Sequence, residues 1–198
     1  MDMVKVILAH TRGLTWEKAR ALPLLLATDV AEADRYRNPD DKVLHLVSAF
    51  LKRKYVGAWT ISPDGKPLSP TVCFNASHTE GLVALALAAL DVGVDVERVR
   101  TTDADLRNYI AAPDERAHIH SNEDFFRLWT AKESLVKAEG TGFDVKPDKV
   151  PALPLEGCKT YKNHRYYSRQ TEVGDCVLSV TRRTDRPFEW DIEKENIL

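Results

Sequence analysis

The alternation of apolar and polar positions predicts strands and helices that follow one another along the chain. Residues 3–9 are rich in Val, Ile and Leu and alternate loosely, so we predict an opening strand. Residues 15–26 have a helical pattern, which Pro23 is expected to interrupt. Apolar residues at helical spacing predict a second helix from about Pro39 to Tyr55.

The middle of the chain is predicted to hold two adjoining strands. The apolar run 82–90 is ambiguous, because its Ala and Leu residues favour a helix while its place between two turn-like segments favours a buried strand. We predict a strand here and a second one over residues 91–99. Residues 104–112 are predicted to be helical, and residues 113–115 to begin another helix.

The longest predicted helix covers residues 123–139. Gly140 supplies its stop, and Gly140-Thr141-Gly142 predicts a tight turn after it. Its periodic positions are Phe125, Leu128, Trp129, Lys132, Leu135 and Val136. Residues 160–170 and 175–181 are predicted to form a closing strand pair, and the chain from Arg186 onward a loosely held tail.

Composition excludes several classes of protein. The 198 residues are 43% hydrophobic and 29% charged with a net charge of -2, which suits one large domain or two small ones. The overall charge gives no basic field for nonspecific nucleic-acid binding. Neither a membrane-spanning apolar run nor a leader peptide is apparent, so we expect a cytoplasmic protein. Cys73, Cys158 and Cys176 have no metal-site spacing and are expected to be core thiols.

Two carboxylates in one predicted strand suggest a metal site. Asp95 and Glu97 lie on one face of that strand, with Val94 and Val96 on the other. Two adjacent anions favour solvent or a cation, and Mg²⁺ commonly binds one or two protein carboxylates together with phosphate oxygens. A D-x-E pair alone is most often an exposed strand face, but the apolar run before it argues against a purely solvated position.

Further polar residues have two interpretations each. Glu133 and Lys137 lie four residues apart, so they form either an intrahelical ion pair or a third metal carboxylate with a phosphate ligand. Ser77 and His78 follow an apolar segment, where they could donate to a phosphate or simply cap a turn and face solvent. Lys66 lies in a loop with three prolines, residues 62–70, which could grip an anionic ligand or serve only as a connector.

Four motifs occur in a fixed order and together are more specific than any one alone. They are Lys66-Pro67, Phe74-Asn75-x-Ser77-His78, Gly93-x-Asp95-x-Glu97 and Trp129-x-x-Lys132-Glu133-x-x-x-Lys137-x-x-Gly140-x-Gly142. In this order and approximate spacing the chain resembles the surfactin-type 4'-phosphopantetheinyl transferases.

The resemblance implies both a fold and a reaction. It implies an α+β fold of two similar halves in pseudo-twofold arrangement. Residues 1–91 would form the half on the coenzyme A adenine and 3'-phosphate side, and residues 92–198 the half with the Mg²⁺ site and the catalytic helix. The reaction would move 4'-phosphopantetheine from coenzyme A to a serine of an apo acyl or peptidyl carrier protein, releasing adenosine 3',5'-bisphosphate. A chain of two fused halves is expected to be a monomer.

The resemblance also assigns roles by position. Asp95, Glu97 and Glu133 would hold Mg²⁺, Lys66 and Pro67 would lie along the adenine, His78 and Lys137 would bind phosphates, and Ser77 would shape that site. Glu133 is the candidate base, and Lys137 would also stabilise charge on the leaving phosphate.

The cation for the 3'-phosphate is less well defined. Arg35 and Arg53 align plausibly, with Arg37 and Lys42 as alternatives, because Leu44 or His45 stands where the family usually has an arginine. Lys52 and Lys54 complete the basic residues of this segment, and a solvated helix face is the simpler explanation of them. The basic stretch 159–169 is the expected docking surface for an acidic carrier protein.

Two other functions use the same residues. An Mg²⁺-dependent hydrolase of coenzyme A or a nucleotide would use the three carboxylates with water as nucleophile. A coenzyme A binding module would keep Lys66 and the basic helix without needing the carboxylates.

Overall fold

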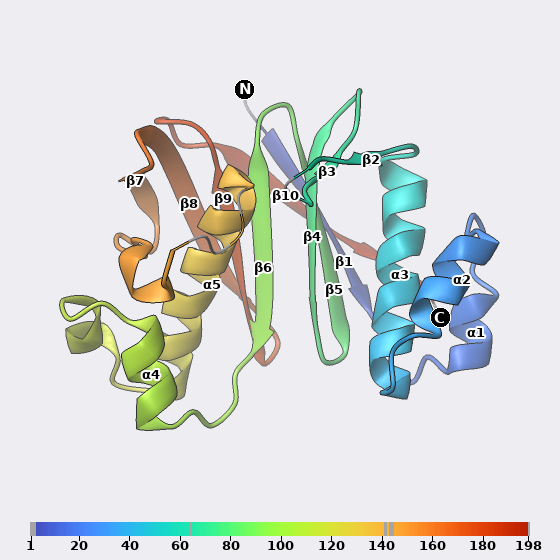
Figure 1. Ribbon diagram of the computed structural model, residues 1–198, viewed down its shortest axis with the longest axis horizontal. Coiled ribbons are helices and arrows are strands. Elements are labelled where there is room, and N and C mark those ends of the chain that lie inside the picture. The colour runs from blue at the N-terminus through green and yellow to red at the C-terminus, as the bar shows by residue number, and fades with distance from the viewer. Residues whose placement is uncertain (1–2, 64, 141, 143–144, 198) are drawn as a thin grey trace.

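Helices flank two four-stranded sheets on opposite sides of the molecule (Figure 1). This computed structural model describes residues 3–63, 65–140, 142 and 145–197. Asp64 of the predicted loop, Thr141 of the predicted turn and the outermost residues of the two predicted halves lie outside that description.

The first part of the chain builds one sheet and the helices that cover it. Its elements are β1 (Met3–His10), α1 (Trp16–Arg20), α2 (Ala27–Ala33), α3 (Pro39–Tyr55), β2 (Thr60–Ile61), β3 (Pro67–Leu68), β4 (Cys73–Thr79) and β5 (Leu82–Ala88). The expected helix over residues 15–26 is wrong in length, since α1 ends at Arg20 and α2 begins only at Ala27. Pro23 lies in the break, where it has no N–H to give to a continuing helix.

The second part builds the other sheet and adds one strand, β10, to the first sheet. Its elements are β6 (Val92–Arg98), α4 (Ala104–Ile110), α5 (Asn122–Glu139), β7 (Gly157–Tyr161), β8 (His164–Val173), β9 (Cys176–Arg182) and β10 (Glu189–Glu195), with single 3-10 turns at Glu115–His118 and Pro147–Lys149. The helix expected to begin at residues 113–115 is therefore one 3-10 turn. The strand expected over residues 160–170 is divided by a turn, because Lys162 and Asn163 adopt left-handed φ values of 45° and 66°.

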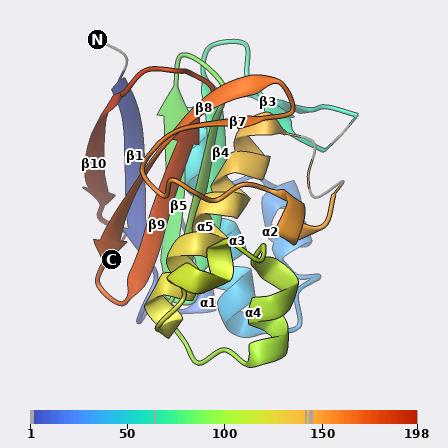
Figure 2. The same ribbon diagram turned by 90° about the vertical axis from the view of Figure 1, so that its left-hand side faces the viewer.

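The predicted loose tail is wrong. β10 pairs with β1 in parallel, with Met3 opposite Glu189 and Ala9 opposite Glu195 (Figure 2). Phe188, just before this strand, is buried at 3% exposure. The strand therefore returns the end of the chain to the sheet that the first residues began.

The two sheets share a pattern of pairing. Their strand orders are β10-β1-β5-β4 and β6-β9-β8-β7. In the first sheet β1 pairs with β5, and β5 pairs with β4, the strand just before it in the chain. In the second sheet β6 pairs with β9 in the same way, and β9 pairs with β8. The predicted α+β fold is confirmed, and a twofold relation between the halves stays a prediction.

Strand alternation divides the core into layers. Val4, Val6 and Leu8 of β1 face a cluster shared with the second sheet, whereas Ile7 and Ala9 face the cluster beneath α1, α2 and α3. On β6, Val92, Val94 and Val96 join the shared cluster. Asp95 and Glu97 consequently face the other side, toward α5.

Two other expectations concern cysteines and membranes. Cys176 is buried, but Cys73 and Cys158 are only partly buried because each lies on an edge strand of its sheet. Within the ranges described above, no helix combines the length and apolarity needed to cross a bilayer.

Candidate active site

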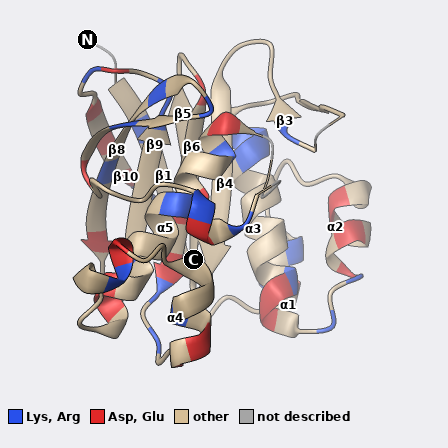
Figure 3. Ribbon diagram, turned by 60° about the vertical axis from the view of Figure 1, so that its left-hand side comes forward, with Lys and Arg blue, Asp and Glu red and all other residues tan. Residues whose placement is uncertain are grey.

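The acidic residues singled out in the sequence line one pocket between β4, β6 and α5. Asp95 and Glu97 come from β6, and Glu133 and Lys137 from α5, which carries both acidic and basic positions (Figure 3). This pocket has a volume of about 250 Å³. We call it the carboxylate pocket, and its lining residues are Ala76, Ser77, His78, Asp95, Glu97, Glu133 and Lys137.

Local sequence fixes α5 above this pocket. Ser121 caps the helix and accepts from the Asp124 N–H at 3.0 Å, while Asp124 accepts from the Ser121 N–H in return. Gly140 ends the helix with a φ of 88°. Two hydroxyl contacts bind its buried face to β9, Thr130 to Ser179 at 2.6 Å and Ser134 to Thr181 at 2.8 Å.

A glycine allows α5 to approach the sheet closely. A Cβ at Gly93 would lie 2.0 Å from the Ser134 carbonyl oxygen and 2.4 Å from the Ala138 nitrogen. The helix backbone therefore occupies the space that any other residue would fill. This approach brings Glu133 and Lys137 within reach of the β6 carboxylates.

The two carboxylate oxygens of Asp95 differ in their hydrogen bonding. Its Oδ1 accepts from Lys137 Nζ at 2.6 Å and from Ser77 Oγ at 2.8 Å. Its Oδ2 is buried and has no hydrogen-bond partner among the described residues. A buried, unpaired carboxylate oxygen is costly unless a ligand satisfies it.

The carboxylates disfavour one another's ionised forms. Burial, followed by the charge of Asp95, raises the pKa of Glu133 to about 7. Burial and then the Asp95 charge also raise the pKa of Glu97, against the opposing effect of Arg100, whose Nη1 lies 3.0 Å away. The pocket thus holds more negative charge than its own cations neutralise, and an added cation would relieve this.

The residues present fit a hard divalent ion, although they are not drawn together around one. Across the described part of the chain, no three His, Cys, Asp or Glu side chains converge closely enough to hold a metal ion as they stand. Lys137 instead contacts Asp95. The donor set of three carboxylates and the unsatisfied Asp95 Oδ2 nevertheless match the oxygen ligands that Mg²⁺ takes.

Ser77 and His78 lie on opposite faces of β4. Ser77 is buried, donates to Asp95 and accepts from Lys137 Nζ at 3.1 Å. His78 is exposed on the face toward α3, where His45 and Lys52 are among the charged groups that act on it. Desolvation and then the Lys137 charge lower the pKa of its imidazole.

The basic residues in α3 and just before it differ in their partners and exposure. Arg53 forms a bidentate pair with Asp29, at 2.8 and 2.9 Å, and its expected role toward a phosphate stays a prediction. Lys42 pairs with Asp34 at 3.2 Å, and Arg37 is exposed at the surface. Arg35 lines a small hollow with Glu32, Tyr36 and His45.

Sequence reasoning missed Lys52 and His45 as pocket residues. Both line a polar pocket of about 390 Å³ beside α3, together with Trp59. Burial lowers the pKa of each, and in His45 the Lys52 charge lowers it further. Lys52 directly follows the apolar residues Phe50 and Leu51 of α3, and this position could have indicated that its side chain is partly buried.

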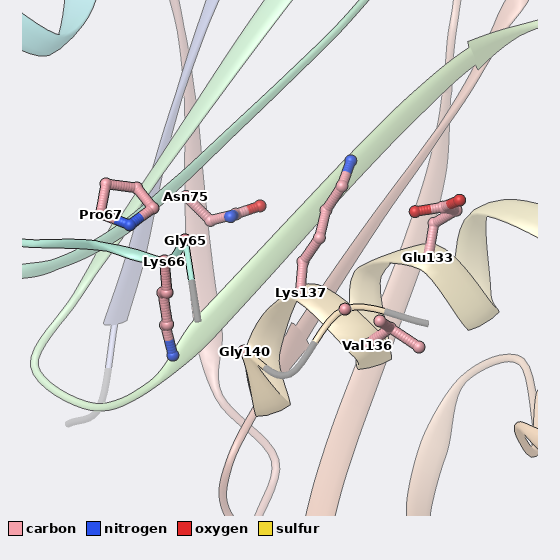
Figure 4. A pocket seen from close by; sticks show the side chains of 9 residues that line it. Gly65, Lys66, Pro67, Asn75, Glu133, Val136, Lys137 and Gly140 are labelled. Atoms are coloured by element: carbon pink, nitrogen blue, oxygen red, sulfur yellow. The ribbon is translucent and has the colours of Figure 1, made fainter. Parts of the chain in front are cut away.

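A second pocket adjoins the carboxylate pocket at Glu133 and Lys137 (Figure 4). Lys66 and Pro67 of the β2–β3 hairpin line it, and their place beside the adenine stays a prediction. Lys66 Nζ, however, is bound by Asp91 Oδ1 at 2.8 Å and by the Ala138 carbonyl at 3.2 Å, near the end of α5. Its charge is therefore directed at the helix terminus, and its stem passes where a Gly140 Cβ would lie, 2.5 Å from Cδ.

The expected docking surface is wrong at its first residue. Lys159 is buried at 5% exposure and its ammonium donates to the Ala152 carbonyl, so it cannot meet a partner. Arg169 stacks on Trp190 and donates to the Phe188 carbonyl at 3.1 Å. Arg165, which contacts the Cys158 sulfur, remains exposed.

Comparison with known proteins identifies the family. The model of the 4'-phosphopantetheinyl transferase superfamily matches residues 91–181. A putative 4'-phosphopantetheinyl transferase of Synechocystis is 30% identical over 187 aligned residues, which cover 77% of this chain and 74% of that protein. The chain belongs to the 4'-phosphopantetheinyl transferase superfamily.

Other members of the superfamily match shorter stretches. The 4'-phosphopantetheinyl transferase gsp of Aneurinibacillus migulanus is 31% identical over 125 residues, 54% of this chain and 53% of that protein. The 4'-phosphopantetheinyl transferase Sfp of Bacillus subtilis is 27% identical over 93 residues, 42% of each. The chain thus matches about half, or less, of the length of these relatives. The superfamily match spans β6, α5 and β9, which carry or support the three carboxylates.

Proposed function

We propose that this protein transfers 4'-phosphopantetheine from coenzyme A to a serine of an apo acyl or peptidyl carrier protein. The products are the holo carrier protein and adenosine 3',5'-bisphosphate. The observation that supports this most is that a member of this superfamily brings Asp95, Glu97, Glu133 and Lys137 to a single pocket.

The pocket residues divide the work of the transfer. Asp95, Glu97 and Glu133 would hold Mg²⁺, which when bound supplies positive charge to the coenzyme pyrophosphate. Glu133, on α5 beside the two β6 carboxylates, is the residue that would take the proton of the carrier serine as its oxygen attacks phosphorus. The bond that breaks joins that phosphorus to the oxygen of the departing adenosine 3',5'-bisphosphate.

Cationic and neutral donors would then stabilise the leaving phosphate. Lys137, now 2.6 Å from Asp95 Oδ1, can turn toward a phosphate oxygen because both lie in the same pocket. His78 on the exposed face of β4 can donate from its ring N–H. Ser77 stays buried, where it holds Asp95.

The rest of the coenzyme has two places to lie. Lys66 and Pro67 line the pocket that adjoins the carboxylate pocket. We propose that the adenine binds there, beside the hairpin. His45 and Lys52 face the same side of β4 as His78. They are therefore better candidates to bind the 3'-phosphate, near α3, than Arg53, which pairs with Asp29. Of the four cations expected from the sequence, Arg35 and Arg37, both exposed, remain further candidates for this phosphate. We also propose that the protein acts in the cytoplasm as a monomer.

One assay tests the proposal. The protein is incubated with coenzyme A, Mg²⁺ and an apo carrier protein, and the carrier is weighed by mass spectrometry. We expect the mass of one phosphopantetheine to be added. Cleavage of coenzyme A without labelling of the carrier would indicate the Mg²⁺-dependent hydrolase instead, and the absence of any product would leave a coenzyme A binding module.

Variants in the pocket test the metal assignment. Asp95→Asn and Glu97→Gln should each abolish transfer while leaving the fold intact, because each removes a charged ligand without changing side-chain size. Glu123→Gln is the control, since Glu123 lies on the same helix and pairs with Arg127 away from the pocket. Mg²⁺-dependent transfer retained by Asp95→Asn or Glu97→Gln would overturn the assignment.

A further inference from the structure

The two sheets meet along β4 and β6, which are edge strands of different sheets. Side chains of β4 bind β6 where a neighbouring strand would otherwise form backbone hydrogen bonds. The residues responsible are the alternate positions Asn75, Ser77 and Thr79, which we call the polar row. Only Ser77 has a place in the proposed reaction.

The polar row binds both the backbone and the carboxylates of β6. Asn75 Oδ1 accepts from the Val94 N–H at 3.0 Å, and Thr79 Oγ1 accepts from the Arg98 N–H at 3.2 Å. Between them, Ser77 donates to Asp95. The Thr79 hydroxyl also donates to Glu97 Oε2 at 3.4 Å.

The spacing of these contacts sets the register of the strands. Asn75 and Thr79 are four residues apart, and the residues whose N–H groups donate to them, Val94 and Arg98, are also four residues apart. The two strands therefore run in parallel with matched rise. A one-residue slip of β6 would turn Asp95 and Glu97 to the other face, and a two-residue slip would leave the buried backbone N–H of Val94 without Asn75.

We infer that Asn75 and Thr79 are positioning residues, which lock β6 in register against β4 and so present Asp95 and Glu97 to the pocket. Thr79 acts most directly, because its hydroxyl contacts Glu97. Asn75 acts through the buried Val94 amide. It lies at the end of the polar row where it also lines the second pocket, the one that Lys66 and Pro67 line (Figure 4). The role of the two carboxylates as metal ligands rests on the proposed function. The register of β6 against β4 does not depend on that function.

The experiment compares Thr79→Val with Thr79→Ser. Valine has nearly the shape of threonine but neither gives nor accepts a hydrogen bond, whereas serine keeps the hydroxyl. The probe is Mn²⁺, whose binding to the whole chain is followed by electron paramagnetic resonance in the presence of coenzyme A. We expect Thr79→Val to weaken Mn²⁺ binding about fivefold to tenfold, as loss of one hydrogen bond implies, and Thr79→Ser to restore it.

A control separates register from general stability. Ser168 in β8 is also buried, and among the described residues its hydroxyl contacts Thr181 at 2.8 Å but no carboxylate. Ser168→Ala should lower thermal stability without changing Mn²⁺ binding. If Thr79→Val folds poorly, Asn75→Ala gives a second measurement, with the same weakening expected.

Each outcome bears on the inference. Wild-type Mn²⁺ affinity in Thr79→Val, no recovery in Thr79→Ser, or an equal loss in Ser168→Ala would overturn it. Failure of the wild-type chain to label a carrier protein would sink the proposed function but not the register, because Mn²⁺ binding is measured without a carrier.

Discussion

Lys132 shows how much one residue can hold in place. It lies on the apolar stripe of α5 and is fully buried, at 0% exposure. Its ammonium is 2.6 Å from Glu115 Oε2 and donates to the carbonyls of Pro147 and Val150. Glu115 in turn accepts from the Ala112 and Ala152 N–H groups, each at 2.8 Å. The pair thereby ties the segment after α5 to the segment before it.

We predict that Lys132→Met destabilises the protein by about 3–5 kcal/mol, because it leaves the Glu115 charge buried without a cation. Urea denaturation followed by circular dichroism measures the loss. Lys149→Met, which removes an exposed lysine two residues after Pro147, should stay near the wild type. The double variant Glu115→Gln/Lys132→Met should recover part of the loss. Equal stability of Lys132→Met and Lys149→Met would contradict this account.

Lys159 makes the stability depend on pH. Burial, and secondarily the Lys132 charge, lowers its pKa to about 8 from 10.5, against the opposing effect of Glu115. Between these values the unfolded chain binds more protons than the folded one, so stability contributed by this group rises with pH. Below about pH 8 both states are protonated and the penalty, on the order of 3 kcal/mol, is fully present.

We therefore predict that the free energy of unfolding of Lys159→Met, minus that of the wild type, falls as pH rises from 8 to 10.5. Taking the difference cancels the titration of the other lysines and tyrosines. Guanidinium denaturation at a series of pH values provides the measurement. A constant difference over this range would show that Lys159 titrates normally despite its burial.

Sequence could identify the acidic residues of the pocket but not the pairing of the basic ones. Alternation places Asp95 and Glu97 on one face of a strand, and helical spacing places Glu133 and Lys137 together. Arg53, in contrast, is taken by Asp29, a residue 24 positions earlier on another helix. No local pattern reveals such a partner, so the Arg53–Asp29 pair could not be predicted, and which cation meets the 3'-phosphate stays a prediction.

At the scale of elements, β6 and α5 approach each other closely at Gly93. Since a Cβ there would overlap the α5 backbone, Gly93→Ala must push the helix away from the strand. We predict that it separates Glu133 from Asp95, abolishes carrier labelling and lowers the melting temperature. Transfer assays and calorimetry measure the two effects.

A glycine in open space provides the comparison for Gly93. Gly174, in the turn between β8 and β9, has a φ of 62°, and a Cβ added there would meet no atom of the described part of the chain within 4 Å. Gly174→Asn should keep activity, because asparagine tolerates the left-handed region. Full activity in Gly93→Ala would mean that the helix does not need this approach.

Elements with local signals were predictable, and those that depend on distant partners were not. α3 begins at Pro39, as the helical spacing predicted, and α5 ends at Glu139, just before the Gly140 that was predicted to stop it. β10 alternates charged and apolar residues like an exposed tail. Its partner β1 lies at the other end of the chain, so only the folded structure shows the pairing.

At the scale of the whole molecule, one buried cluster unites the two halves. It contains Val6 and Leu8 from β1, Val94 from β6 and Val180 from β9, all at 0–1% exposure. Phe188 from the segment before β10 completes it. The inner faces of both sheets therefore bury the same apolar surface.

This shared core predicts that the chain unfolds as a unit. Residues 1–91 alone would lose β10 from the edge of β1, and residues 92–198 alone would expose Val92, Val94 and Val96. Because exposing this much apolar surface removes the main term that favours folding, we expect neither fragment to fold by itself. For the whole chain, tryptophan fluorescence and circular dichroism should report the same midpoint in urea. Two separate midpoints, or a cooperative transition in residues 1–91, would mean that each half keeps a core of its own, and then the boundary at residue 91 would mark two domains rather than two halves of one.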